Sequence, residues 1–332
     1  MTRDPAIDRA RGLAILAVAW FHMTRALINT GHMADNPLLQ WADRLAYGWH
    51  VQIFFLVSGY FLQGRVRRWA DVWPRALDLY WPYLLWSTIT AVLLLAMPTS
   101  GSALRLSDVI VLPVIPFQHY WFLLYLIACI ALMALVGRWP LLVTGLFLVA
   151  NLVAWRADLP QDRLGVTLDN GTYWPAFFFF GAWLAQRGAH LRWHTGPALV
   201  AFAVAALAAL ASVRSGIDIR WSLFFVPSLC ACYALVWLAS RLAVPGLAWL
   251  GQRSLPIFLV HVMVGAVLRA LVYKVAPGIP VAAAFAVIFG GAVAIPVVLD
   301  LVATRLGLAR LAGFAPIVKV RRSGPAPAVS AA

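Results

Sequence analysis

The sequence has 332 residues, of which 63% are hydrophobic and only 11% charged, and its formal net charge is +14 at pH 7. Soluble domains are roughly 45–50% apolar and about 25% charged, so this composition excludes an ordinary water-soluble protein. The basic residues are spread over many short polar breaks and form no nucleic-acid-binding motif. Their distribution is typical of the loops of a membrane protein, so membrane lipids, and not nucleic acid, are the expected partners.

Apolar runs that could cross a bilayer recur along the whole chain, since a spanning helix needs about 20 mostly apolar residues. In chain order, the predicted spans are 7–28, 46–63, 76–97, 119–136, 140–155, 173–187, 197–213, 221–240, 254–274 and 281–304. The segments 140–155 and 173–187 are short, which leaves open whether they cross completely. We therefore predict an all-α fold, a polytopic membrane bundle of about ten transmembrane helices.

The predicted bundle is a single domain over residues 1–322, and the Pro-, Ala- and Ser-rich residues 323–332 are predicted to be a disordered tail. Most Lys and Arg residues fall in alternate breaks between the spans, and positively charged loops stay in the cytoplasm. If the N-terminus is inside, these basic breaks are all cytoplasmic. The sequence thus predicts a multi-pass protein of the cell inner membrane with both termini in the cytoplasm.

The first span carries three ionisable residues, Asp8, Arg11 and His22. Such residues are costly within a membrane and usually face the bundle interior or a water-filled cavity. Arg11 and His22 are three helical turns plus roughly 20° apart, so they share a face and are separated by about 16–17 Å along the axis. That length is comparable to the pantetheine arm of CoA.

These residue types suit the two ends of an acyl-CoA. Arg11 can hold phosphate, His22 can act as a general base near neutral pH, and Asp8 can orient the Arg11 guanidinium. The alternative is that Arg11 extends to the lipid headgroups and His22 lies at the outer interface.

The second span, in WHVQIFFLVSGYFLQGRVRRW, is aromatic and ends in Ser58, Gly59 and Tyr60. The small pair permits close helix packing. The basic residues that follow could bind the phosphates of CoA, although the cytoplasmic preference of basic loops explains them equally well; they are Arg65, Arg67, Arg68 and Arg75. His50 begins this span near the predicted level of His22, either as part of the acceptor site or as an interfacial residue.

Four motifs in this order resemble acyltransferase family 3. They are the Arg11 to His22 spacing, FFLVSGYFL at 54–62, HYWFLLYLI at 119–127 and SLPIFLVH at 254–261. The resemblance implies a ten-helix membrane enzyme that modifies hydroxyl groups of cell-envelope glycans or similar acceptors, with acyl-CoA as the donor. It also implies that Arg11 and His22 are the essential pair and that His22 is the base.

One departure from the family concerns the segment before the third span. The family often has two arginines three residues apart there, whereas PRALDLYWP has Arg75 and Asp78. Donor binding would then depend on Arg75 together with Arg65, Arg67 or Arg68, which leaves an atypical donor possible.

Several other polar residues have two possible roles. The predicted substrate-binding residues are His50, Ser58, Tyr60, Trp121 and His261. His261 could instead form a helix–helix hydrogen bond, and Trp121 could belong to the aromatic belt at the membrane surface. Asp300 is predicted to form a structural ion pair with Arg305 or to lie at the interface.

No phosphate-binding loop, HExxH zinc helix or GxSxG nucleophile is present, so neither a metal nor a covalent enzyme is predicted. The predicted function is transfer of an acyl group, most simply acetyl, from cytoplasmic acyl-CoA to a hydroxyl of a sugar or envelope glycan. A transporter or flippase for a glycan or lipid is the main alternative, and a structural subunit is a third. The oligomeric state and the acceptor stay open.

Overall fold

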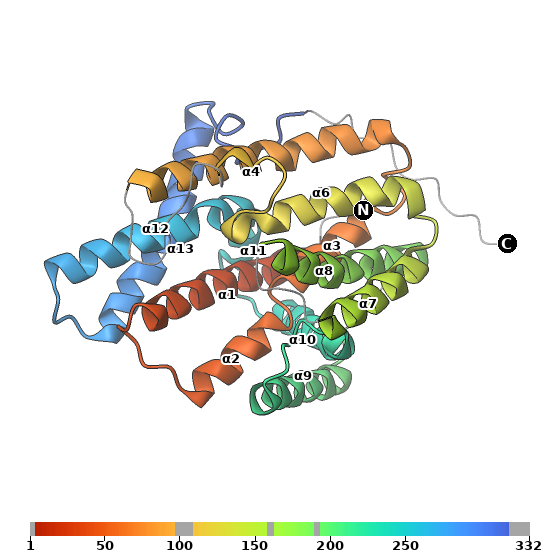
Figure 1. Ribbon diagram of the computed structural model, residues 1–332, viewed down its shortest axis with the longest axis horizontal. Coiled ribbons are helices and arrows are strands. Elements are labelled where there is room, and N and C mark those ends of the chain that lie inside the picture. Colours follow the sequence, from red (N-terminus) through yellow and green to blue (C-terminus); the bar gives the residue numbers. More distant parts are fainter. Residues whose placement is uncertain (1–3, 97–108, 158–162, 189–192, 319–332) are drawn as a thin grey trace.

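The computed structural model describes residues 4–96, 109–157, 163–188 and 193–318 as a bundle of helices, with no β-strand in these ranges (Figure 1). The long helices are α1 (Pro5–Asn29), α2 (Pro37–Tyr47), α3 (Gln52–Leu62), α4 (Trp69–Ala96), α6 (Trp121–Val136), α7 (Pro140–Arg156), α8 (Arg163–Gln186), α9 (Thr195–Ser215), α10 (Phe225–Arg241), α12 (Ser254–Val275) and α13 (Val281–Arg305). Two 3₁₀ turns, η1 (Gln118–Tyr120) and η2 (Ser222–Phe224), and the short α11 (Leu247–Gln252) join them. The predicted tail lies outside the described residues.

Within the described ranges, eight helical segments are long and apolar enough to cross a membrane. They are Pro5–Asn29, Pro37–Leu62, Trp69–Leu95, Gln118–Val136, Thr195–Ser215, Ser222–Arg241, Ser254–Val275 and Val281–Arg305. The all-α membrane fold is therefore confirmed. The two predicted spans outside this set correspond to α7 and α8, the same two segments that the sequence marks as short.

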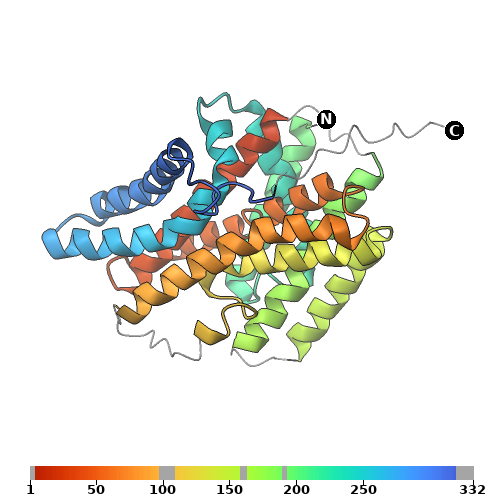
Figure 2. The ribbon, with the colours of Figure 1, turned by 90° about the horizontal axis from the view of Figure 1, so that it is seen from above.

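The outer helices expose large apolar side chains, as lipid-facing helices do. Examples are Leu142 of α7, Leu207 of α9 and Val298 of α13, each more than half exposed. The hairpin of α12 and α13 projects from the rest of the bundle (Figures 1 and 2). The interior is largely aromatic around α8, where Trp174 and Phe178 are fully buried.

The second predicted span, 46–63, falls, apart from its last residue, within the membrane-length segment Pro37–Leu62, but that segment is not one continuous helix. The chain forms α2 and α3 with a break between them, although together they still make one membrane-length segment. At the break, Gln52 Nε2 donates to the Tyr47 carbonyl at 2.5 Å and His50 Nδ1 lies 2.6 Å from the Ala46 carbonyl oxygen. The Gln52 side chain thus occupies a carbonyl that a continuous helix would have used, whereas the Ala46 carbonyl also accepts the backbone N–H of His50 at 3.0 Å. The break holds His50 inside the bundle.

Two glycine pairs bring the helices around α1 and α3 close together. Gly59 of α3 and Gly181 of α8 each face a backbone carbonyl of the other helix so closely that a Cβ could not be added without moving something. Gly12 of α1 and Gly251 of α11 pack in the same way. Such small residues permit backbone approach between membrane helices, and here they fix α1 and α3.

The third span starts earlier than predicted, at Trp69 instead of residue 76. The Asp71 carboxylate accepts the backbone N–H groups of Arg67 and Arg68 at 3.0 and 3.1 Å, which satisfies donors at the start of the helix. As a result, Arg75 and Asp78 lie on α4 and not in a loop.

One end of the bundle collects the basic segments, and we call it the basic end. There, Arg9 Nε at the start of α1 donates to the Ala239 carbonyl at the end of α10, at 2.6 Å. Gln63 Nε2 after α3 donates to the Gly137 carbonyl after α6, at 3.2 Å. At the other end, Arg25 Nη2 of α1 donates to the two carboxylate oxygens of Asp43 of α2, at 2.5 and 2.7 Å. The two ends thus carry different sets of loops, as the predicted alternation requires.

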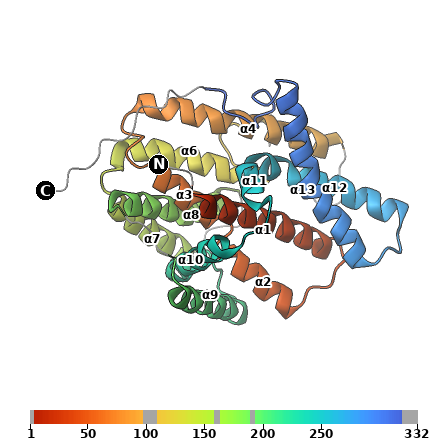
Figure 3. The same cartoon turned by 180° about the vertical axis from the view of Figure 1, so that it is seen from behind.

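The chain after α13 folds back beside α4 (Figure 3). The indole N–H groups of Trp81 and Trp86 donate to the carbonyls of Leu311 and Ala312, both at 2.9 Å. Residues 306–318, which we call the C-terminal strap, are therefore attached along the third span.

Candidate active site

A cavity of about 710 Å³ lies between α1, α3, α4, α6 and α12. Its wall includes both Arg11 and His22, so the face predicted for the first span does point into the interior. Ligand-binding cavities are typically about 300–1,000 Å³, which makes this one large enough for an extended substrate.

At the basic end of the cavity, Arg11 is held by neighbours on two elements. Its Nη2 donates to the Ser254 hydroxyl at 3.0 Å, and its Nη1 lies 3.7 Å from the Asp8 carboxylate. Asp8 is buried and also accepts from Gln252 Nε2 at 3.0 Å. The predicted pairing of Asp8 with Arg11 is therefore present, and it fixes a guanidinium at the cavity wall.

Arg75 and Asp78 add two more charged groups to this end of the wall. Arg75 Nη1 donates to the Asp71 carbonyl at 2.5 Å. Asp78 Oδ1 accepts the backbone N–H groups of Ile317 and Val318 at 2.7 and 2.9 Å. The residue that replaces the second family arginine thus anchors the C-terminal strap.

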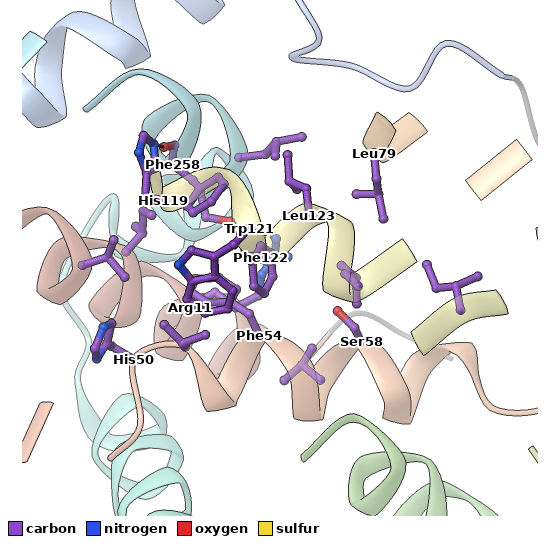
Figure 4. Close-up of a pocket in the computed structure, with 18 of the residues that line it drawn as sticks. Arg11, His50, Phe54, Ser58, Leu79, His119, Trp121, Phe122, Leu123 and Phe258 are labelled. Atoms are coloured by element: carbon purple, nitrogen blue, oxygen red, sulfur yellow. Dashed lines mark hydrogen bonds between the residues drawn. The ribbon is translucent and has the colours of Figure 1, made fainter. Parts of the chain in front are cut away.

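The middle of the cavity is apolar and aromatic. Figure 4 shows Phe54 and Trp121 between His50 and His119 on one side and Ser58 and Leu79 on the other. Trp121 stacks on Trp174 with ring centroids 5.4 Å apart. Trp121 is therefore inside the bundle, on the cavity wall, and not part of a surface belt.

At the end away from Arg11, three histidines from three different segments meet. The ring centroid of His22 lies 5.1 Å from that of His261 and 5.9 Å from that of His119, and the last two are 5.0 Å apart. His22 and His119 are on the cavity wall, and His261 is fully buried behind them. We call these residues the histidine cluster.

His119 was not among the predicted site residues. The sequence feature that could indicate a role for His119 is its position near Trp121 in HYWFLLYLI. The same aromatic pattern is also typical of a membrane surface. Gln118, just before it, has a φ of +48°, a left-handed conformation that is uncommon for a residue other than glycine and often occurs at functional sites. This turn directs His119 to the cluster.

The structure brings together most, but not all, of the predicted residues. Those on the cavity wall are Arg11, His22, His50, Ser58, Arg75 and Trp121. Tyr60 lies off the wall, and Arg65, Arg67 and Arg68 are exposed at the basic end outside the cavity. Asp300 forms an ion pair, but its partner is Arg253, 3.3 Å away, and not Arg305.

Comparison with known proteins agrees with this arrangement. A family model described as an acyltransferase domain, that of acyltransferase family 3, matches residues 4–301. The chain belongs to acyltransferase family 3. It is therefore a multi-pass membrane acyltransferase. No curated protein and no solved structure matched it.

For an acyltransferase of family 3, the cavity offers a cation-lined end, an apolar middle and a histidine-lined end. Among the described residues, no group of three or more His, Cys, Asp or Glu side chains is arranged to hold a metal ion.

Proposed function

We propose that this acyltransferase moves an acyl group, most simply acetyl, from acyl-CoA to a hydroxyl of a sugar or envelope glycan. The observation that supports it most is one cavity whose wall has Arg11 near one end and His22 near the other. The axial separation of about 16–17 Å between these residues suits a CoA thioester that lies along the first span. In this proposal the basic end faces the cytoplasm of the cell and the protein lies in the inner membrane.

In the proposed donor site, Arg11 and Arg75 bind phosphate oxygens through charge-assisted hydrogen bonds. Asp8 and Ser254 hold the Arg11 guanidinium, so less side-chain freedom is lost when the donor binds. The exposed arginines 65, 67 and 68 lie outside the cavity and attract the anionic nucleotide electrostatically. The apolar middle encloses the pantetheine arm.

In the proposed reaction, His22 takes the proton from the acceptor hydroxyl. The oxygen then attacks the thioester carbonyl carbon, the C–S bond breaks, and the CoA thiolate receives the proton from His22. His50, Ser58 and Trp121 contact the acceptor from the cavity wall, and the face of the Trp121 indole suits the apolar face of a sugar ring.

The test is transfer of radiolabelled acetyl from acetyl-CoA into envelope material by membranes that carry equal amounts of each variant. His22→Ala is expected to lower the rate by about 10²–10⁴-fold, the range that a general base contributes. Arg11→Ala is expected to raise the KM for acetyl-CoA by about 10-fold or more, as loss of a hydrogen bond from a charged group does. His32→Ala and Arg241→Ala are matched controls, because both residues are exposed and off the cavity wall.

Three results would contradict parts of this proposal. Full activity of His22→Ala would show that His22 is not the base. An unchanged KM for acetyl-CoA in Arg11→Ala would show that Arg11 does not bind the donor. No transfer by the wild type from acetyl-, succinyl- or longer acyl-CoA would reject the activity and favour the transporter instead.

A further inference from the structure

The histidine cluster contains two buried ring nitrogens that have no hydrogen-bond partner among the described residues. They are Nδ1 of His119 and Nε2 of His261. Buried polar atoms in proteins are nearly always hydrogen-bonded, and exceptions often mark a functional site. Both atoms belong to rings that pack within 6 Å of His22, measured between ring centroids.

Hydrogen bonds on the opposite sides of these rings determine which nitrogen carries the proton. His119 Nε2 lies 3.0 Å from the carbonyl oxygen of Phe258, and His261 Nδ1 lies 2.9 Å from the carbonyl oxygens of Ile257 and Phe258. A carbonyl only accepts, so these nitrogens carry the protons of the neutral rings. The two remaining nitrogens therefore present lone pairs, and each needs a donor.

His119 and His261 are nearest to each other, with ring centroids 5.0 Å apart, but the N–H of each is directed to a carbonyl, so His22 is the neighbouring ring that can supply an N–H. His261 is fully buried and is not on the cavity wall, so a substrate cannot reach its Nε2 without displacing His22 or His119. The other charged or titratable groups that face His22 are His50 and Arg25. Asp43 accepts from Arg25 at 2.5 and 2.7 Å, and the Ala46 carbonyl accepts from His50 at 2.6 Å.

We propose that His119 and His261 are positioning residues for His22, whose N–H they accept when it takes up the proton of the acceptor hydroxyl. This inference rests on the proposed function. Neutral His22 has one N–H, and the protonated ring has two. The nitrogen that takes the acceptor proton faces the substrate, so the N–H that faces the cluster is the one already present in neutral His22. Positive charge on the ring makes that N–H a stronger donor, so the cluster is better matched to the protonated ring than to the neutral one. Interactions that strengthen as the reaction proceeds raise kcat.

Conservative substitutions separate this role from a purely structural one. An asparagine amide overlaps the Nδ1 side of a histidine ring, and a glutamine amide overlaps its Nε2 side. His261→Asn therefore keeps the bond to the Ile257 carbonyl and loses the acceptor, whereas His261→Gln keeps an acceptor oxygen and loses that bond. At His119 the order is reversed: His119→Gln keeps the bond to the Phe258 carbonyl, and His119→Asn keeps the acceptor.

The experiment measures acetyl transfer by purified protein in lipid nanodiscs, with acetyl-CoA and methyl glucoside as probe substrates. His261→Asn and His119→Gln are expected to lower kcat by about 10- to 100-fold, within the roughly 10²–10⁴-fold effect of the base itself, with the KM for acetyl-CoA unchanged. His261→Gln and His119→Asn are expected to retain most of kcat. The opposite ranking at both positions would overturn the proposal, because it would mean that only the structural bonds matter.

A second measurement needs neither turnover nor a variant. In wild-type protein labelled with ¹⁵N-histidine and kept at neutral pH, a ¹⁵N–¹⁵N coupling is expected across a hydrogen bond from the N–H of His22 to His261 or His119. Absence of that coupling in folded protein whose histidine signals are assigned would overturn the inference. If the coupling is present but the wild type transfers no acyl group, the proposed function fails and the positioning role stands.

Discussion

The contact between α3 and α8 gives the most direct prediction about how the fold supports the cavity. A Cβ added at Gly59 would lie less than 3.0 Å from the carbonyl oxygen of Phe178, and one added at Gly181 would meet the carbonyl of Leu56 in the same way. These oxygens belong to helical backbone and cannot rotate away. The substitution Gly59→Ala must therefore push the two helices apart.

The expected cost follows from that overlap. The helices must separate by about 1 Å or more, and overpacking of a tight contact costs about 1–3 kcal/mol, here at the upper end because both partners are backbone. The better helix propensity of alanine returns about 0.5–1 kcal/mol. The net loss of stability is about 2 kcal/mol. Because Phe54 and Ser58 of α3 line the cavity, the KM for acyl-CoA should rise as well.

The assay is thermal unfolding of detergent-purified protein, followed by kinetics. Gly145→Ala is the matched control, since Gly145 also lies inside a helix, α7, and its added Cβ meets nothing within 4 Å. Gly145→Ala should be as stable as the wild type or slightly more so. Equal melting temperatures for Gly59→Ala and Gly145→Ala would refute the reasoning.

Three further predictions concern charged groups. Arg75→Ala should raise the KM for acetyl-CoA by about 10-fold or more in steady-state kinetics. The ratio of the two KM values should be smaller at high salt, because salt also weakens donor binding by the wild type. Asp78→Ala removes the acceptor for the Ile317 N–H, so limited proteolysis should cut the C-terminal strap about tenfold faster. Burial alone would raise the pKa of Asp218, but the hydrogen bonds and charge of Arg220 outweigh it and hold that pKa below its ordinary value. The stabilisation is therefore present at neutral pH and lost as the pH falls through that lowered pKa, so Asp218→Asn should melt below the wild type at pH 7 and level with it in strong acid.

The helices were largely predictable because a bilayer leaves the backbone few alternatives to a helix. All ten predicted segments contain helix. The failures came where side chains compete for backbone groups. The Gln52 side chain bonds to the Tyr47 carbonyl at the break in the second span, and Asp71 extends the third span towards its N-terminus. Neither effect changes hydropathy, so neither is visible in an apolar run.

Helical spacing predicts the site only where one helix carries it, and other predicted residues on the cavity wall, such as Ser58 and Trp121, come from the family motifs. The helical period places Arg11 and His22 on a common face, and both are on the cavity wall. His119 and His261 come from other segments, and their approach to His22 depends on how three segments pack. No spacing in the sequence encodes that distance, so the sequence predicts Trp121 but not its neighbour His119 as a site residue.

Asp78 shows how a departure from a family pattern can change meaning once the fold is known. In the sequence it reads as the loss of a cation from the donor site. In the structure its carboxylate accepts two backbone N–H groups of the C-terminal strap, and hydrogen bonds to a charged acceptor are among the stronger ones. An arginine at this position would add a cation to the cavity wall but leave those two donors without their acceptor. Restoring the family pattern by Asp78→Arg would therefore detach the strap from the third span, so a gain in donor binding cannot be read from the charge alone.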